Sequence, residues 1–173
     1  MASPRYVRGL PLSTPESPEV VSVPIGRWSV VAAPRQIRTL LGSCAGVILH
    51  DRAAKLGGVA HIVLPDSRGE VNHPGKFADT AIPGMIADLD RLLGRNSRGR
   101  LTAKIVGGAS MFQTGPALNI GKMNQDAVDQ ILAGLGIPVL ARDVGGGAGR
   151  RLTLDVGSGI VTIRVPGGED YVI

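Results

Sequence analysis

The stretch that decides the fold runs from Leu41 to Leu64 and reads LGSCAGVILHDRAAKLGGVAHIVL. Two short runs of small aliphatic and β-branched residues, 45–50 and 58–64, flank the mostly polar segment 51–57. Runs of this kind are typical of β-strands, and the segment between them has the length of a hairpin connection. The sequence therefore predicts an antiparallel β-hairpin at the centre of the fold.

The register of this hairpin decides which side chains meet. If the turn is centred between Arg52 and Ala53, residues whose numbers sum to 105 lie opposite each other, and Cys44 then faces His61. Directly opposed side chains have Cβ atoms about 4.5–5.5 Å apart. A register slip of one residue would instead put the thiol and the imidazole on opposite faces. The hairpin thus predicts a cysteine–histidine pair.

Outside the hairpin, strands and helices alternate in the middle of the chain, and hairpins lie toward its ends. The predicted strands are 28–33, 103–106, 137–142, 152–156 and 160–165, and the predicted helices, from their apolar periodicity, are 79–93 and 119–135. The segment 34–38 is interpreted as a link. This order predicts an α/β fold with a mixed β-sheet, flanking helices and terminal hairpins.

Length and composition predict one domain. A chain of 173 residues with 43% hydrophobic content can bury one substantial core. Residues 1–26 are rich in Pro, Ser and charge, with Val20, Val21 and Val23 as their one candidate strand, so we interpret them as a mostly flexible leader and residues 27–173 as a single folded domain. No apolar stretch approaches the ~20 residues of a membrane span, which predicts a cytoplasmic protein without direct membrane insertion.

The formal net charge of +5 favours an acidic partner, either nucleic acid or a Glu-rich protein. The densest basic groups are Arg95 to Arg100 and Arg150-Arg151, and no aromatic residues for base stacking are interleaved with them. No RNA- or DNA-binding signature accompanies them. We therefore expect solvated basic surfaces rather than a nucleic-acid site.

Cys44 is the chain's one cysteine, which excludes an internal disulfide and a multi-cysteine zinc site. A lone cysteine is more often a small buried hydrophobe than a nucleophile. Three features favour a nucleophile here: the residue begins a strand, it has a histidine across the hairpin, and it follows Gly42 and Ser43. Backbone amides in that turn could face an oxyanion.

His61 is the histidine with the right spacing to activate the thiol by forming a thiolate–imidazolium pair. His50 lies at the far end of the Cys44 strand, and His73 lies in a polar loop. The alternative for His61 is an ordinary core histidine. Thr39 could orient the imidazole through its hydroxyl, or it could be an ordinary strand threonine.

Neither a metal nor another cofactor is expected. The three histidines lack metal-ligand spacing and no carboxylate cluster accompanies them. The glycine-rich segment 145–150 lacks the Lys-Ser/Thr of a phosphate-binding loop, so we expect it to shape or cover the site.

Several blocks of the chain resemble the CheD family of chemoreceptor glutamine deamidases. In chain order they are Thr39-Leu-Leu-Gly-Ser-Cys44, Gly58-Val-Ala-His61-Ile-Val-Leu-Pro65, Lys76-Phe-Ala-Asp79, Lys104-Ile-Val-Gly-Gly-Ala-Ser-Met111, Asn119-Ile-Gly-Lys-Met-Asn124 and Asp143-Val-Gly-Gly146 through Arg150. The resemblance runs from about Trp28 to Val165. Because independent motifs recur in one order, it is specific.

The resemblance implies a three-layer α/β fold, similar to the deamidating cytotoxic necrotizing factor toxins. It implies cofactor-free deamidation of receptor glutamines to glutamate, with Cys44 as nucleophile, His61 as base then acid, and Thr39 as orienting residue. The implied partners are the cytoplasmic helices of methyl-accepting chemotaxis receptors and a CheC-like phosphatase. Two alternatives stay open: a non-catalytic module that docks to receptor or phosphatase, and a methylesterase side activity.

Overall fold

The computed structural model describes residues 17–110 and 119–173, whose strands form two mixed five-stranded sheets. Sheet A contains, in spatial order, β1 (Val20–Ser22), β3 (Gln36–Leu41), β8 (Arg150–Asp155), β9 (Val161–Arg164) and β10 (Tyr171–Val172). Sheet B contains, in spatial order, β2 (Trp28–Ala32), β5 (Leu56–Ile62), β4 (Ala45–Asp51), β6 (Thr102–Gly107) and β7 (Val139–Val144). The helical segments are η1 (Pro74–Lys76), α1 (Ala78–Leu93) and α2 (Ile120–Gly134).

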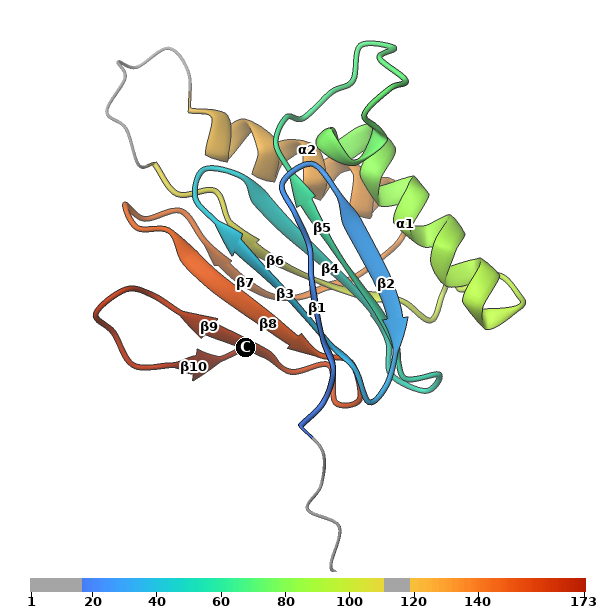
Figure 1. The fold of residues 1–173 in the computed structure, drawn as a ribbon. Coiled ribbons are helices and arrows are strands. Elements are labelled where there is room, and N and C mark those ends of the chain that lie inside the picture. Colours follow the sequence, from blue (N-terminus) through green and yellow to red (C-terminus); the bar gives the residue numbers. More distant parts are fainter. Residues whose placement is uncertain (1–16, 111–118) are drawn as a thin grey trace, which may run out of the picture.

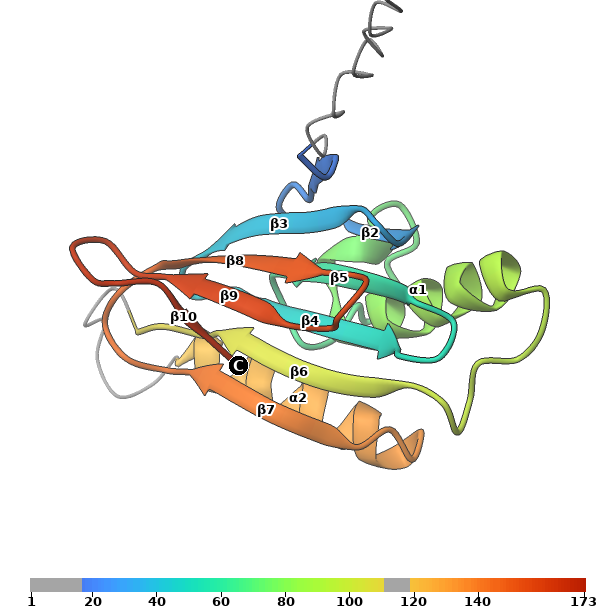
Figure 2. The ribbon, with the colours of Figure 1, turned by 90° about the horizontal axis from the view of Figure 1, so that it is seen from below.

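The molecule has three layers: sheet A, sheet B and the two α-helices (Figure 1). The two sheets lie one above the other when the ribbon is viewed from below, and both helices cover the face of sheet B that points away from sheet A (Figure 2). The three-layer α/β prediction is confirmed. The described structure adds that two of the layers are sheets and that one helical layer covers a single face.

The central hairpin of β4 and β5 is buried on both faces, which explains its nearly continuous apolar sequence. Alternate residues of these strands serve two separate cores. Val47 and Ala60 pack toward the helices, whereas Ile48 and Val59 pack toward sheet A. Any polar side chain on the second face therefore lies between the sheets, and His61 is one of these.

The two predicted helices are confirmed with small changes at their ends. The buried face of α1 contains Ile82, Met85 and Leu89, at the helical spacing seen in the sequence. The helix ends at Gly94, whose left-handed backbone lets its N–H donate to the Arg91 carbonyl. At the start of α2, the Asn119 side chain accepts a hydrogen bond from the Lys122 N–H.

The predicted hairpin register is wrong by two residues. The structure pairs His61 with Gly46, so opposed residues sum to 107 and Cys44 would lie opposite Val63. A four-residue loop causes the shift. In it, the Asp51 carboxylate accepts a hydrogen bond from the Ala54 N–H (2.9 Å).

A two-residue shift preserves the face that each side chain occupies. Cys44 and His61 therefore still point to the same side of sheet B, as diagonal rather than directly opposed neighbours.

The folded part begins earlier than the predicted boundary at residue 27. Strand β1 pairs in parallel with β3, and Val23, just after it, is 4% exposed. The predicted link at 34–38 is also too long, because β3 already begins at Gln36. The run of valines and the alternation of Ile37, Thr39 and Leu41 are the local signals of these two strands. Residues 1–16 lie outside the described residues, so the flexible leader stays a prediction for them.

Candidate active site

The candidate site lies between the two sheets, where β3 of sheet A passes over β5 of sheet B. Thr39, at the centre of β3, points inward and is buried, as is His61 near the end of β5. The Thr39 hydroxyl oxygen lies 2.8 Å from His61 Nδ1. The hydrogen bond thus joins the two sheets and fixes the plane of the imidazole.

A second hydrogen bond determines which nitrogen of His61 holds the proton. The Thr39 hydroxyl donates to the Val23 carbonyl oxygen (2.8 Å), so its own proton is already engaged. The hydroxyl oxygen can then only accept from Nδ1–H of His61. The neutral imidazole accordingly carries its proton on Nδ1 and presents Nε2 as an acceptor, which is the tautomer that a general base requires.

Cys44 and His61 line the same pocket, which has a volume of about 420 Å³. The residues around it are Val23, Ile25, Thr39, Leu40, Gly42, Ser43, Cys44 and His61. Cys44 lies one residue before β4 at the end of the turn from β3, and it is the one free cysteine of the chain. The thiol and the unprotonated nitrogen of the imidazole therefore share one small volume.

The backbone around Cys44 leaves two donors in the turn. The N–H groups of Ser43 and Cys44 donate to no acceptor within residues 17–110 and 119–173, whereas the Gly42 and Cys44 carbonyls accept from Ala109 and Gly108. The two carbonyls are thus hydrogen-bonded to the segment after β6, while the two amides remain available to a bound substrate. Paired free amides next to a nucleophile are suited to hold an oxyanion.

Burial shifts both titrating groups toward their neutral forms. Removal from water raises the pKa of the Cys44 thiol and lowers the pKa of the His61 imidazole. The two shifts favour a thiol beside a neutral imidazole over the thiolate–imidazolium pair expected from the sequence. Proton transfer between them is then expected to accompany attack on a substrate rather than precede it.

The glycine-rich segment after β7 supports the site from one layer away. Its Gly145 N–H donates to the Gly107 carbonyl, and its Gly146 carbonyl accepts from Ser110. Gly107 has φ +100, and a Cβ there would lie 2.4 Å from the Cys44 carbonyl oxygen, so only glycine permits this close approach. The segment supports the turn that holds Cys44 and does not line the pocket, so of the two roles expected from the sequence, shaping the site or covering it, the described contacts fit the first.

The structure brings together all five residues that the sequence singled out: Thr39, Gly42, Ser43, Cys44 and His61 line one pocket. Sequence reasoning missed three others there, Val23, Ile25 and Leu40. The signal for Leu40 was its place in the alternation of β3, which puts an apolar side chain on the outer face of the strand.

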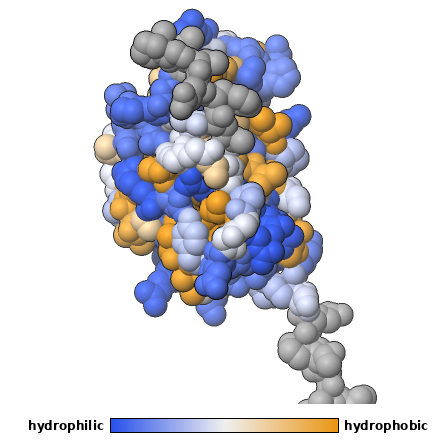
Figure 3. Space-filling view, turned by 90° about the vertical axis from the view of Figure 1, so that its left-hand side faces the viewer, coloured by the Kyte–Doolittle hydropathy of each residue, from blue (hydrophilic) through white to orange (hydrophobic). Residues whose placement is uncertain are grey.

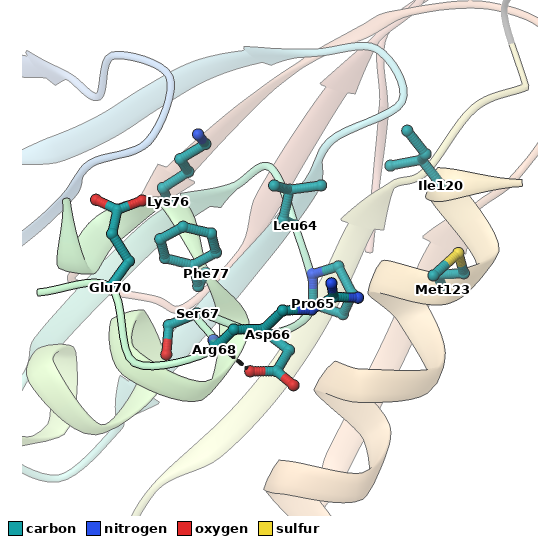
Figure 4. Close-up of a pocket in the computed structure, with 10 residues that line it drawn as sticks. All are labelled: Leu64, Pro65, Asp66, Ser67, Arg68, Glu70, Lys76, Phe77, Ile120 and Met123. Atoms are coloured by element: carbon teal, nitrogen blue, oxygen red, sulfur yellow. Dashed lines mark hydrogen bonds between the residues drawn. The ribbon is translucent and has the colours of Figure 1, made fainter. Parts of the chain in front are cut away.

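A second pocket, of about 430 Å³, lies between the segment after β5 and the start of α2 (Figure 4). Leu64, Pro65 and Met123 supply its apolar wall, and Asp66 accepts a hydrogen bond from the Arg68 N–H at its edge. Neither Cys44 nor His61 lines it. Of these two pockets, the thiol and the imidazole therefore line the first.

Two negative findings concern the described residues alone. No three His, Cys, Asp or Glu side chains gather within them in an arrangement that could hold a metal ion. None of the helices in residues 17–110 and 119–173 is long and apolar enough to cross a membrane.

Fold and site together define a three-layer α/β protein with a cysteine, a histidine and a threonine in one pocket between two sheets. The family described as "CheD chemotactic sensory transduction" matches residues 63–165. Together with the relatives described next, this match shows that the chain belongs to the CheD family.

The curated relatives cover most of the chain. A "Probable chemoreceptor glutamine deamidase CheD" of Desulforamulus reducens is 47% identical over 88% of this chain and 95% of the relative. A protein of the same name from Moorella thermoacetica is 46% identical over 87% of this chain and 93% of the relative. The "Chemoreceptor glutamine deamidase CheD" of Thermotoga maritima is 42% identical over 84% of this chain and 92% of that relative.

Proposed function

We propose that this chain hydrolyses the side-chain amide of glutamine residues on chemotaxis receptors, releasing ammonia and leaving glutamate. The names of its relatives supply the reaction and the substrate class. One observation carries the mechanism: the Thr39–His61 hydrogen bond leaves Nε2 of the imidazole unprotonated in the pocket that holds the chain's one thiol. A histidine with only a structural role in the core would not be expected to share a pocket with the chain's one thiol.

In the first half of the reaction, Cys44 Sγ attacks the amide carbon while its proton passes to His61 Nε2. The carbonyl oxygen becomes an oxyanion, which the N–H groups of Ser43 and Cys44 stabilise. Gly42 precedes them in the turn and leaves the approach to these amides without a side chain. His61 then donates its proton to the departing nitrogen, ammonia leaves, and a thioester remains on Cys44.

In the second half, water attacks the thioester carbon and His61 Nε2 accepts a proton from that water. Collapse of the intermediate breaks the carbon–sulfur bond and returns the proton to the thiolate, which restores the thiol and gives glutamate. Each step uses the same imidazole alternately as base and acid. Thr39 holds the imidazole in the one orientation that serves both halves, and no cofactor is required.

The test is ammonia release from a receptor cytoplasmic fragment, together with mass spectrometry of its glutamines. The wild-type chain should release ammonia and raise the mass of each converted glutamine by about one unit. Cys44→Ala should abolish both signals, because no other thiol exists in the chain. Ammonia release by Cys44→Ala at the wild-type rate would overturn the proposal.

His73→Ala serves as the matched control, because His73 is exposed and pairs with Glu70 outside the site. It should retain wild-type ammonia release.

The Cys44→Ala chain also tests the docking alternative and the CheC-like partner. If it still binds receptor fragments or a CheC-like phosphatase, docking does not require the chemistry. The methylesterase side activity is tested by offering a methyl ester of glutamate to the wild-type chain as a substrate.

A further inference from the structure

Two large apolar side chains stand in solvent at the mouth of the Cys44 pocket. Leu40 is 69% exposed and Ile25 is 63% exposed, and both line the pocket. They come from different segments: Leu40 from the end of β3, and Ile25 from the turn between β1 and β2. Neither belongs to the two cores of the fold. Their position next to the thiol gives them access to whatever enters the pocket.

Arginines accompany Leu40 on the outer face of sheet A. The alternation of β3 places Arg38 on the same face two residues earlier, and the register of sheet A places Arg151 of β8 directly beside Leu40. Neither arginine forms an ion pair with a carboxylate of the described residues. The neighbouring Arg164, in contrast, is neutralised by Asp170.

We call Ile25, Leu40, Arg38 and Arg151 the mouth rim. The eight residues that line the pocket include no carboxylate. Arg151 lies close enough to Asp170 to contribute to the lowered pKa of that carboxyl, but Asp170 forms its ion pair with Arg164 and leaves Arg38 and Arg151 without one. The rim also offers no aromatic side chain, which single-stranded nucleic acid would use for stacking. Apolar side chains flanked by free cations fit a polypeptide that presents an apolar group between carboxylates.

No broad apolar surface offers a competing docking site on the side of the molecule shown in Figure 3. Where the grey atoms do not cover that side, hydrophobic residues lie in small patches among hydrophilic ones. Small patches of this kind are normal on a protein surface and by themselves identify no partner. The mouth rim differs because it is continuous with the pocket.

We propose that the mouth rim is the docking surface for the glutamine-bearing segment of the substrate, a segment with acidic residues near the glutamine. The glutamine enters the pocket, an apolar side chain of the segment packs against Leu40 and Ile25, and its carboxylates pair with Arg38 and Arg151. This inference rests on the proposed deamidation. The rim then selects which glutamines are modified, while Cys44 and His61 perform the chemistry on any glutamine that docks.

The charge half of the proposal is tested by the double variant Arg38→Gln/Arg151→Gln in steady-state ammonia release from a receptor fragment at low salt. KM should rise by about tenfold with kcat within about twofold of wild type, since the rim contacts bind the segment but do not touch the reacting amide. The salt dependence of kcat/KM should also become weaker. Arg52→Gln/Arg98→Gln removes the same charge at two exposed sites away from the mouth and should keep the wild-type KM and salt dependence.

The apolar half is tested by Leu40→Ser, with Leu140→Ser as its matched control. Leu140 is 62% exposed on β7 of sheet B and does not line the pocket. Leu40→Ser should raise KM about fivefold, and Leu140→Ser should leave it unchanged. Alkylation of Cys44 by iodoacetamide should proceed at the wild-type rate in all of these variants, which verifies that the pocket is intact.

Failure of this inference is distinguishable from failure of the proposed function. If wild type releases ammonia and both the Arg38→Gln/Arg151→Gln and the Leu40→Ser chains keep the wild-type KM, the mouth rim is not the docking surface. If wild type releases no ammonia, the deamidation itself fails. In that case the rim is tested by binding of the receptor fragment to the Cys44→Ala chain, and unchanged binding on Arg38→Gln/Arg151→Gln substitution overturns it as well.

Discussion

The two ends of the space between the sheets each hold a buried histidine on the central hairpin, and they differ in what surrounds the second ring nitrogen. His50 of β4 uses Nε2 to donate to the Val156 carbonyl (2.8 Å), and Gly159 packs so closely that a Cβ there would lie 2.6 Å from Nδ1. His61 of β5 uses Nδ1 to bond Thr39, and its Nε2 remains for the pocket. The His50 ring is packed against Gly159, whereas the equally buried His61 ring borders the pocket that holds Cys44.

The difference shows that burial alone does not separate a structural histidine from a candidate catalytic one. Both side chains are buried, both lie on the same face of sheet B, and each makes a hydrogen bond to a partner outside its own sheet. Only His61 combines a fixed tautomer with a thiol in the same pocket. The two histidines therefore serve as each other's control.

The largest expected effect comes from replacing each histidine in turn. His61→Gln should lower kcat for ammonia release by about 10²–10⁴-fold, because glutamine cannot exchange a proton with the thiol, while the free energy of unfolding changes little. His50→Leu should do the reverse. It leaves the Val156 carbonyl without its donor, at a cost of about 1–3 kcal/mol of unfolding free energy, and keeps the rate per folded molecule.

Denaturant unfolding and ammonia release, measured on the same preparations, check this contrast. A His50→Leu chain that folds normally but loses activity would remove the distinction between the two ends.

The next effect in size concerns Thr39, which has no counterpart at the His50 end. Thr39→Val keeps the shape of the side chain but removes the hydroxyl that accepts from His61 Nδ1 and donates to the Val23 carbonyl. The imidazole is then free to rotate and to change tautomer, so kcat should fall by about 10–100-fold with little change in KM. Thr39→Ser restores the hydroxyl and should recover most of the rate. Equal losses in the two variants would indicate a packing role instead.

A smaller and more gradual effect is expected from pH. Burial lowers the pKa of His61 and raises the pKa of Cys44, so the neutral pair spans more than the ordinary interval between about 6.5 and 8.5. kcat/KM should be flat across that interval, fall at lower pH as His61 becomes protonated, and fall at higher pH as the thiol ionises.

The rate of Cys44 alkylation by iodoacetamide distinguishes the neutral pair from an ion pair. For a neutral thiol the rate should still be rising with pH above about 8.5. A plateau that is already complete near pH 6 would show a thiolate–imidazolium pair and contradict the pKa directions.

Much of the fold was predictable because local patterns dominate it. The helices, the central hairpin and most strands follow from the periodicity of apolar residues and from the glycines that mark turns and element ends. The hairpin register was not predictable, because the Asp51 carboxylate and the left-handed backbone of Lys55 define a four-residue loop, and apolar patterning does not encode these choices. Strand β1 was recognised as a candidate from its valines but was left outside the predicted domain, since three residues give little signal until a partner strand is known.

The residues of the site were predictable for a different reason. One cysteine and three histidines leave few combinations, and the face of each side chain survives a two-residue error in register. The Val23 carbonyl could not be predicted, because a backbone acceptor has no sequence signature. Ile25 could not be recognised either, since it lies in a turn, whereas the alternation of β3 was a signal that Leu40 lies on the outer face.

The smallest expected effect on activity comes from Gly159, which closes the His50 end. Gly159 has φ +76, and Gly167 has the same φ with no atom near its added Cβ, so alanine at each position imposes the same backbone strain. Gly159→Ala should lose about 1–3 kcal/mol more unfolding free energy than Gly167→Ala, because its methyl group collides with the His50 ring. Both chains should keep ammonia release per folded molecule within about twofold of wild type. Adding His50→Ala should remove most of the extra loss, since the ring that the methyl group strikes is gone. Equal losses for the two glycine variants would mean that Gly159 is not tightly packed against His50, and the contrast between the two histidines would then rest on Thr39 alone.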